Sequence, residues 1–127
     1  MTPPVWMNAV IRDFGLAAGA NDFALNARGA AALNFANGVV FRLEYTGEEL
    51  VMAMTTPWHG DTASLRRLMT FADPRARLGF KVRVALMSRS GRLLMAVRLA
   101  EREVTLPTMN AVFAALWRLV HEIGVAA

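Results

Sequence analysis

The chain has 127 residues, which is enough for one domain and leaves no room for a second. Its 55% hydrophobic content excludes a disordered chain, and its lack of cysteine excludes disulfides, thiolate metal sites and thiol nucleophiles. Every long apolar run is broken by a charge or by Gly, Asn or Pro, so no segment is predicted to span a membrane. Because so small a domain has too little interior for this apolar content, we expect a homodimer interface or a hydrophobic partner site.

The net charge of +4 is unevenly distributed along the chain. Residues 66–102 contain ten basic and two acidic side chains, a net charge of about +8, whereas the rest of the chain is net acidic. Such a basic segment suits nucleic acid, an acidic partner or a membrane surface. A solvated face with a bias toward arginine explains it equally well, so charge alone leaves the partner open.

The first periodic segment predicts an amphipathic helix over residues 5–18, preceded by two prolines and ended by Gly19 and Asn21. Arg12 and Asp13 interrupt its apolar run, which is unlike a secretory signal peptide. The apolar stripe is too wide for a peripheral helix and consists of Trp6, Val10, Phe14 and Ala17, widened by Met7, Ile11 and Ala18.

Two alternating segments around Ala36-Asn37-Gly38 predict a β-hairpin. A two-residue Asn-Gly turn would pair Phe35 with Val40 and place the two apolar sets on opposite faces. A three-residue loop with a left-handed Gly38 pairs Phe35 with Val39 and places both sets on one face, and we expect this register. The shared face would hold Ala31, Leu33, Phe35, Val39, Phe41, Leu43 and Tyr45. After a turn, Leu50–Thr55 is predicted to complete an antiparallel meander.

The second half is predicted to add a short helix, two strands and a long helix. The short helix begins at Asp61 or Thr62 and ends near Ala72, before Asp73-Pro74. Two alternating strands at residues 80–87 and 93–100 follow, each with an apolar face and a face of small residues and arginine.

The last helix is predicted between Pro107 and Gly124 and carries the strongest helical stripe in the chain. Its apolar residues are Met109, Val112, Phe113, Leu116, Trp117, Val120 and Ile123. The resulting order α-β-β-β-α-β-β-α predicts an α+β fold with an antiparallel sheet, in one domain over residues 1–127.

Residue types that carry catalysis are scarce. His59 and Asp61 form the most suggestive cluster, but they lack a nucleophile and are explained more simply by a loop and a helix cap. His121 is predicted to be a solvated residue near a helix C-terminus. There is no nucleotide-binding motif, and we expect no enzyme activity, no metal and no cofactor.

The strand aromatics disfavour nucleic acid as the partner. A sheet that binds single strands presents aromatics on its exposed face, interleaved with Arg or Lys. Here Phe35, Phe41, Tyr45 and Phe80 share the aliphatic faces and are interpreted as core residues. The arginine-bearing face therefore offers no stacking platform.

In its element order and local patterns the chain resembles the class I type III secretion chaperones, the family of the Yersinia Yop and intimin-receptor chaperones. The resemblance covers nearly the whole chain, although members are usually acidic and this chain is not. The segments that carry it are Ile11–Leu16, Leu33–Gly38, Phe41–Tyr45, Leu78-Gly79, Ser88–Leu93, and Leu106 with Phe113 and Trp117.

The resemblance implies a cytoplasmic, non-enzymatic bacterial chaperone that works without ATP as a homodimer. It would bind one secreted effector near the effector's N-terminus and keep that segment extended and secretion-competent. The first and last helices would pack on one side of the sheet, and the short helix and second hairpin would form the dimer contact. The eight methionines suit an adaptable binding surface of this kind.

Two sets of residues are expected to form these contacts. The dimer interface is predicted to contain Leu65, Leu68, Met69, Phe71, Val82, Val84 and Leu86. The effector is predicted to add to a free edge of strand 31–35, beside a groove formed by Trp6, Val10, Phe14, Leu25, Leu33 and Phe35. For each groove residue, a core position is the alternative. The alternative function is a small nucleic-acid-binding or regulatory module that uses the arginines of residues 66–102.

Overall fold

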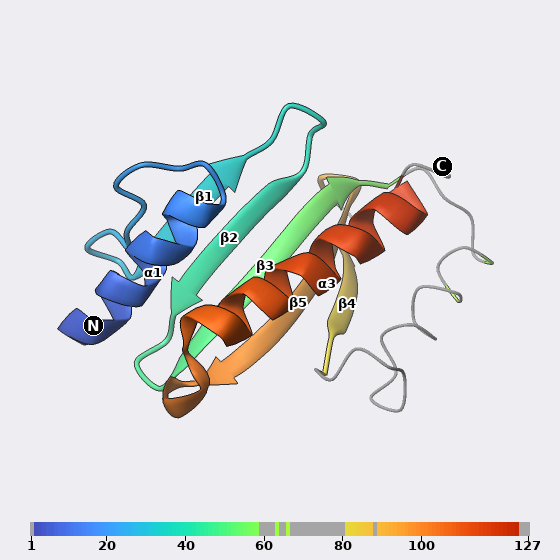
Figure 1. Ribbon diagram of the computed structural model, residues 1–127. Coiled ribbons are helices and arrows are strands. Elements are labelled where there is room, and N and C mark those ends of the chain that lie inside the picture. Colours follow the sequence, from blue (N-terminus) through green and yellow to red (C-terminus); the bar gives the residue numbers. More distant parts are fainter. Residues whose placement is uncertain (1, 59–62, 64–65, 67–80, 88, 125–127) are drawn as a thin grey trace.

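The fold is an antiparallel sheet with two helices on one face (Figure 1). The computed structural model describes residues 2–58, 63, 66, 81–87 and 89–124. The strand order is β1-β2-β3-β5-β4, which makes β1 and β4 the edge strands. The elements are α1 (Val5–Ala17), β1 (Ala30–Asn34), β2 (Val40–Tyr45), β3 (Glu49–Pro57), β4 (Arg83–Met87), β5 (Arg92–Ala100), the 3₁₀ turn η1 (Glu101–Glu103) and α3 (Leu106–Gly124).

The first hairpin has the predicted register. Leu33 pairs with Phe41, and the Phe35 N–H donates to the Val39 carbonyl at 2.9 Å. Gly38 has a φ of +85°, the left-handed conformation that a three-residue loop requires. The four apolar residues predicted to share a face here, Val39, Phe41, Leu43 and Tyr45, are therefore all buried in the core.

Both helices begin and end close to the predicted positions, but the buried stripe of α1 is rotated. Met7, Ile11 and Phe14 are buried, whereas Trp6 is 45% exposed. The reason is that the loop after α1 folds back along the helix and packs Phe23 against Gly15. The core therefore contacts the face centred on Ile11 rather than the face centred on Val10.

The core fills the space between the helices and one face of the sheet. Alternate residues of β3 and β5 point into it, and α3 covers both strands. Five of the eight methionines are completely buried here, namely Met7, Met52, Met54, Met95 and Met109. The prediction that the methionines form an adaptable surface is wrong for these five, because their unbranched side chains fill gaps between helix and sheet.

The strands differ from the predictions most clearly at two ends. Strand β3 continues to Pro57, where it pairs with Arg92, instead of ending at Thr55. Strand β4 begins at Arg83, and Phe80 lies outside the described residues. The short helix predicted for residues 61–72 also lies largely outside them, although Ala63 and Arg66 are helical.

Candidate partner-binding surfaces

The edge strand β1 presents main-chain groups to solvent. The Phe35 N–H bonds to Val39 and the Gly29 carbonyl bonds to Tyr45, so the odd-numbered residues between them direct their polar groups toward β2. The even-numbered residues therefore direct theirs outward, away from the sheet. Among the described residues no strand pairs with this side of β1, and an edge of this kind is one to which an extended peptide can add.

An aromatic cluster lies on the helix side of this edge and joins α3 to the first hairpin. The Phe113 ring lies 5.6 Å from Phe14, 5.0 Å from Phe41 and 6.2 Å from Phe35, measured between ring centroids. Trp117 extends the cluster, with its ring 4.9 Å from that of Phe35. Because Phe35, Phe113 and Trp117 are only half-buried, the cluster continues the core to the surface beside β1.

The predicted groove residues differ in how deeply the structure buries them. Phe14 is 1% exposed, so the core alternative holds for it, although it shares Phe113 with Phe35. Val10 lies one turn before Phe14 and packs against the core, whereas Trp6, two turns before Phe14, is 45% exposed. The remaining groove residues, Leu25 and Leu33, are half-buried against the core.

His121 is not the solvated residue that the sequence predicts. Its ring lies 4.2 Å from that of Trp117, and its Nδ1 lies 2.8 Å from the Trp117 carbonyl. Its Nε2 lies 3.3 Å from the Asn37 amide nitrogen, which fits a tautomer with the hydrogen on Nδ1. The C-terminal part of α3 is thus bonded to the turn of the first hairpin, a contact between residues 84 positions apart.

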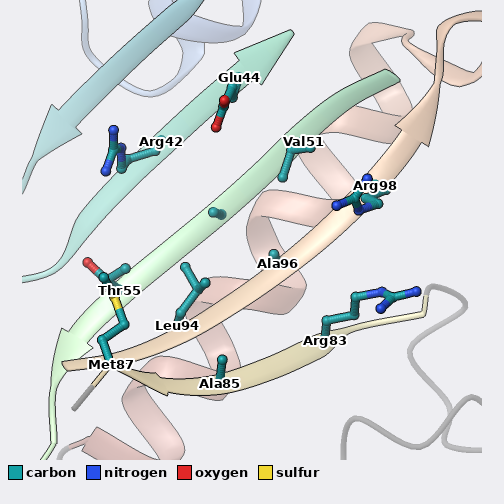
Figure 2. A pocket seen from close by; sticks show the side chains of 11 residues that line it. Arg42, Glu44, Val51, Thr55, Arg83, Ala85, Met87, Leu94, Ala96 and Arg98 are labelled. Atoms are coloured by element: carbon teal, nitrogen blue, oxygen red, sulfur yellow. The ribbon is translucent and has the colours of Figure 1, made fainter. Parts of the chain in front are cut away.

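The opposite face of the sheet is uncovered by any described helix and forms a shallow depression of about 400 Å³ (Figure 2). Its middle consists of small or apolar residues, and charged residues surround them. The lining residues are Arg42, Glu44, Val51, Ala53, Thr55, Arg83, Ala85, Met87, Leu94, Ala96 and Arg98. A small apolar area with charges of both signs around it is suited to contact with another protein.

The predicted dimer residues of β4 lie on the other side of that strand. Val84 pairs with Met95 and Leu86 pairs with Leu93, and both partners point into the core. Val82 is buried, Val84 is half-buried and Leu86 is 48% exposed. The remaining predicted dimer residues, Leu65, Leu68, Met69 and Phe71, lie outside the described residues.

Two of the basic residues in the 66–102 segment make structural bonds. Arg92 donates from Nη2 to the Gly38 carbonyl at 2.7 Å and to the Thr55 hydroxyl at 2.9 Å. Arg98 forms an ion pair with Glu49 at 3.3 Å. Sequence reasoning missed both roles, because neither partner is near its arginine in the sequence.

Tyr45 is the only group whose pKa is clearly displaced within the described part of the chain. Burial raises the pKa of its phenol above the usual 10.0, and the hydrogen bond to Glu101 and its negative charge raise it further. The Tyr45 hydroxyl lies 3.1 Å from the Gly47 carbonyl and 3.2 Å from Glu101 Oε2. It therefore joins β2 to the turn before β3 and to η1, which is a structural role.

The described residues contain no group of three or more His, Cys, Asp and Glu side chains that could hold a metal ion. Among the same residues, no helix combines the length and apolar character needed to cross a bilayer.

The fold is similar to that of several solved structures. A chain of the ExsC–ExsE complex has a TM-score of 0.73 and 20% identity, covering 93% of this chain and 90% of that one. A chain of the Yersinia pestis type III secretion chaperone SycH in complex with a YscM2 fragment has a TM-score of 0.73 and 17% identity, covering 92% and 98%. A chain of the HopA1–SchA chaperone-effector complex has a TM-score of 0.71 and 18% identity, covering 95% and 98%. The protein thus has the fold of the type III secretion chaperones.

The amino-acid sequence identifies the family directly. The family model described as "Type III secretory system chaperone SycN" matches residues 6–124, almost the whole chain. The chain therefore belongs to this family of secretory-system chaperones. A comparison with curated proteins found no match.

Proposed function

We propose that this chain is a bacterial cytoplasmic chaperone that binds the N-terminal segment of a secreted effector and holds it in extended form. The observation that carries the proposal is the free edge of β1, where the outward groups of Ala32 and Asn34 have no partner among the described residues. An added strand would satisfy these groups and place alternate side chains beside Leu33 and Phe35. Family membership supports this role, as do similar folds in chaperone-effector complexes.

The test is co-expression of the full chain with a candidate secreted protein from the genes that neighbour its own. We expect a soluble complex that survives size-exclusion chromatography and is lost when the N-terminal region of the secreted protein is deleted. As a control, deletion of its C-terminal region leaves the complex intact. A secreted protein that is soluble alone and forms no complex with this chain would contradict the proposal.

We further propose that two copies pair through the open face of the sheet. Ala85, Leu94 and Ala96 give this face a small apolar middle, and the opposite charges of Glu44 and Arg83 can pair across a two-fold axis. This face adjoins β4, as does the predicted interface, but it uses the side of the strand opposite to Val84 and Leu86. The predicted contacts of residues 65–71 remain part of this hypothesis.

Light scattering behind a sizing column tests the dimer, which should have twice the chain mass of 13.9 kDa. Ala85→Glu should give a folded monomer, because Ala85 is exposed and a buried interface charge is costly. Ala114→Glu is the matched control, since Ala114 is an exposed residue of α3. A parent chain of single mass, or an unchanged dimer in Ala85→Glu, would reject this interface.

The nucleic-acid alternative receives little support from the described residues. Arg92 and Arg98 are bonded within the chain, and no aromatic side chain lines the open face. Binding of a DNA duplex or single strand can be measured by fluorescence anisotropy over a series of salt concentrations. Submicromolar affinity in physiological salt that falls steeply with added salt would favour this alternative over the chaperone.

A further inference from the structure

The loop before β1 contains a residue that bonds to the strand as a neighbouring strand would. The Asn26 N–H donates to the Ala30 carbonyl at 2.8 Å, and Asn26 Oδ1 accepts the Ala30 N–H at 3.1 Å. Both outward groups of Ala30 are therefore satisfied within the chain. The free edge of β1 begins only at Ala32.

Asn26 is held in this position by its own loop. Its Oδ1 also accepts the Arg28 N–H at 2.9 Å, and its carbonyl accepts the Gly29 N–H at 2.9 Å. Gly29 has a φ of +77°, and a Cβ there would lie 3.1 Å from the Tyr45 carbonyl oxygen. The loop thus needs a glycine at position 29, and its bonds place Asn26 without help from a partner.

We propose that Asn26 sets the register of the bound effector strand by closing one end of the β1 edge. This inference rests on the proposed function. A bound strand can slip by two residues without exchanging its faces, so side-chain patterning alone does not exclude a neighbouring register. Both outward groups of Ala30 are already bonded to Asn26. A register in which the bound strand extends to Ala30 therefore gains no main-chain hydrogen bonds at that residue. The strand is therefore confined to the side of Ala32 and Asn34.

The closed edge also limits the chemistry of the segment that binds. The residue opposite Leu33 would lie on the helix side of the sheet, next to the half-buried Phe35. The residues opposite Ala32 and Asn34 would lie on the open side, where both side chains are exposed. The effector segment is thus a short strand, apolar at the position opposite Leu33 and small or polar at the two flanking positions.

A tethered strand tests the edge without knowledge of the effector. The probe is an alternating Thr-Val strand of about seven residues, fused to the N-terminus of the full chain through a Gly/Ser linker of about 20 residues, which spans about 25 Å. Amide hydrogen exchange is followed by NMR with and without the probe. We expect exchange at Ala32 and Asn34 to slow by about tenfold or more, with Ala30 and Arg28 unchanged. Unchanged exchange at Ala32 and Asn34, or faster exchange at Arg28 as Asn26 is displaced, overturns the inference.

Two substitutions then isolate the Asn26 side chain. Asn26→Ala removes Oδ1, so the Ala30 amide should exchange faster in the free chain and become protected by the probe. Asn26→Asp keeps an acceptor oxygen and should behave like the parent. An Ala30 amide that the probe never protects in Asn26→Ala, or an Asp variant that behaves like the Ala variant, overturns the proposal. If Asn26→Ala does not fold, amide exchange at Arg28 and Ala30 in the parent and in Asn26→Asp still tests whether the probe displaces Asn26.

Failure of the register proposal can be distinguished from failure of the proposed chaperone function. Protection confined to Ala32 and Asn34 without any effector complex in co-expression would contradict the chaperone role alone. An effector complex together with displacement of Asn26 by the probe would contradict the register alone.

Discussion

The guanidinium of Arg92 donates a 2.7 Å hydrogen bond to the carbonyl of Gly38, which connects the first residue of β5 to the turn of the first hairpin. The same group donates to the hydroxyl and the carbonyl of Thr55, on the strand that lies between them. The Arg92 side chain thus bonds both to strand β3 and to the turn between β1 and β2. The edge strand that we propose for effector binding is thereby attached to the centre of the fold.

Arg92→Ala should lower the free energy of unfolding by about 1–3 kcal/mol, because the buried Thr55 hydroxyl loses its donor. Arg92→Lys should recover only part of this loss, since an ammonium cannot reproduce the planar set of donors. Urea denaturation followed by circular dichroism measures both. Arg102→Ala, at an exposed residue of η1, is the control and should change stability by less than about 0.5 kcal/mol. Equal effects at positions 92 and 102 would contradict the structural role of Arg92.

Gly15→Ala should destabilise the protein, although alanine is the better helix former by about 1 kcal/mol. A Cβ at position 15 would overlap the Phe23 side chain, so the loop after α1 would have to move away. We expect a lower melting temperature by differential scanning calorimetry. A higher melting temperature would mean that propensity outweighs packing here, and that Phe23 does not rest on α1.

Proline substitutions distinguish the two sides of β1. Ala32→Pro removes an outward N–H and should abolish effector binding while the chain stays folded, because no bond to β2 is lost. Leu33→Pro removes an N–H directed toward β2 and should destabilise the sheet itself. Circular dichroism and co-purification with the effector separate these effects. Effector binding that survives in a folded Ala32→Pro variant would place the docking site elsewhere.

The raised pKa of Tyr45 predicts a loss of stability in alkali. Burial is its main cause, followed by Glu101, so the folded chain holds the phenol proton more tightly than the unfolded chain. The resulting stabilisation is fully present below about pH 10 and is lost as pH rises through the folded pKa. Tyr45 is the only tyrosine, so the absorbance of tyrosinate reports on it alone. The melting temperature of Tyr45→Phe should fall less between pH 9 and 11 than that of the parent; parallel curves would refute the coupling.

Much of the fold follows from local patterns. The alternation on either side of Ala36-Asn37-Gly38 selected one register, because the other places half of the apolar residues in water. The bounds of α3 follow from Pro107 and Gly124 for the same local reason. The stripe of α1 was placed slightly wrongly, since its apolar residues cover more than half the helix and periodicity cannot say which of them faces the sheet.

What the sequence determined by itself was the first and last helices, the approximate positions of the five strands and the register of the first hairpin, all of which depend on residues a few positions apart. The tertiary structure decided the insertion of β5 between β3 and β4, the contact of His121 with Asn37, and the bond from Arg92 to Gly38 across 54 positions. It also decided which outward groups of β1 remain free, because that depends on how the loop at Asn26 returns to Ala30. Local structure is encoded in spacing because neighbouring residues share one backbone geometry. Contacts between distant segments have no fixed spacing, and only the packed chain brings their donors and acceptors within reach.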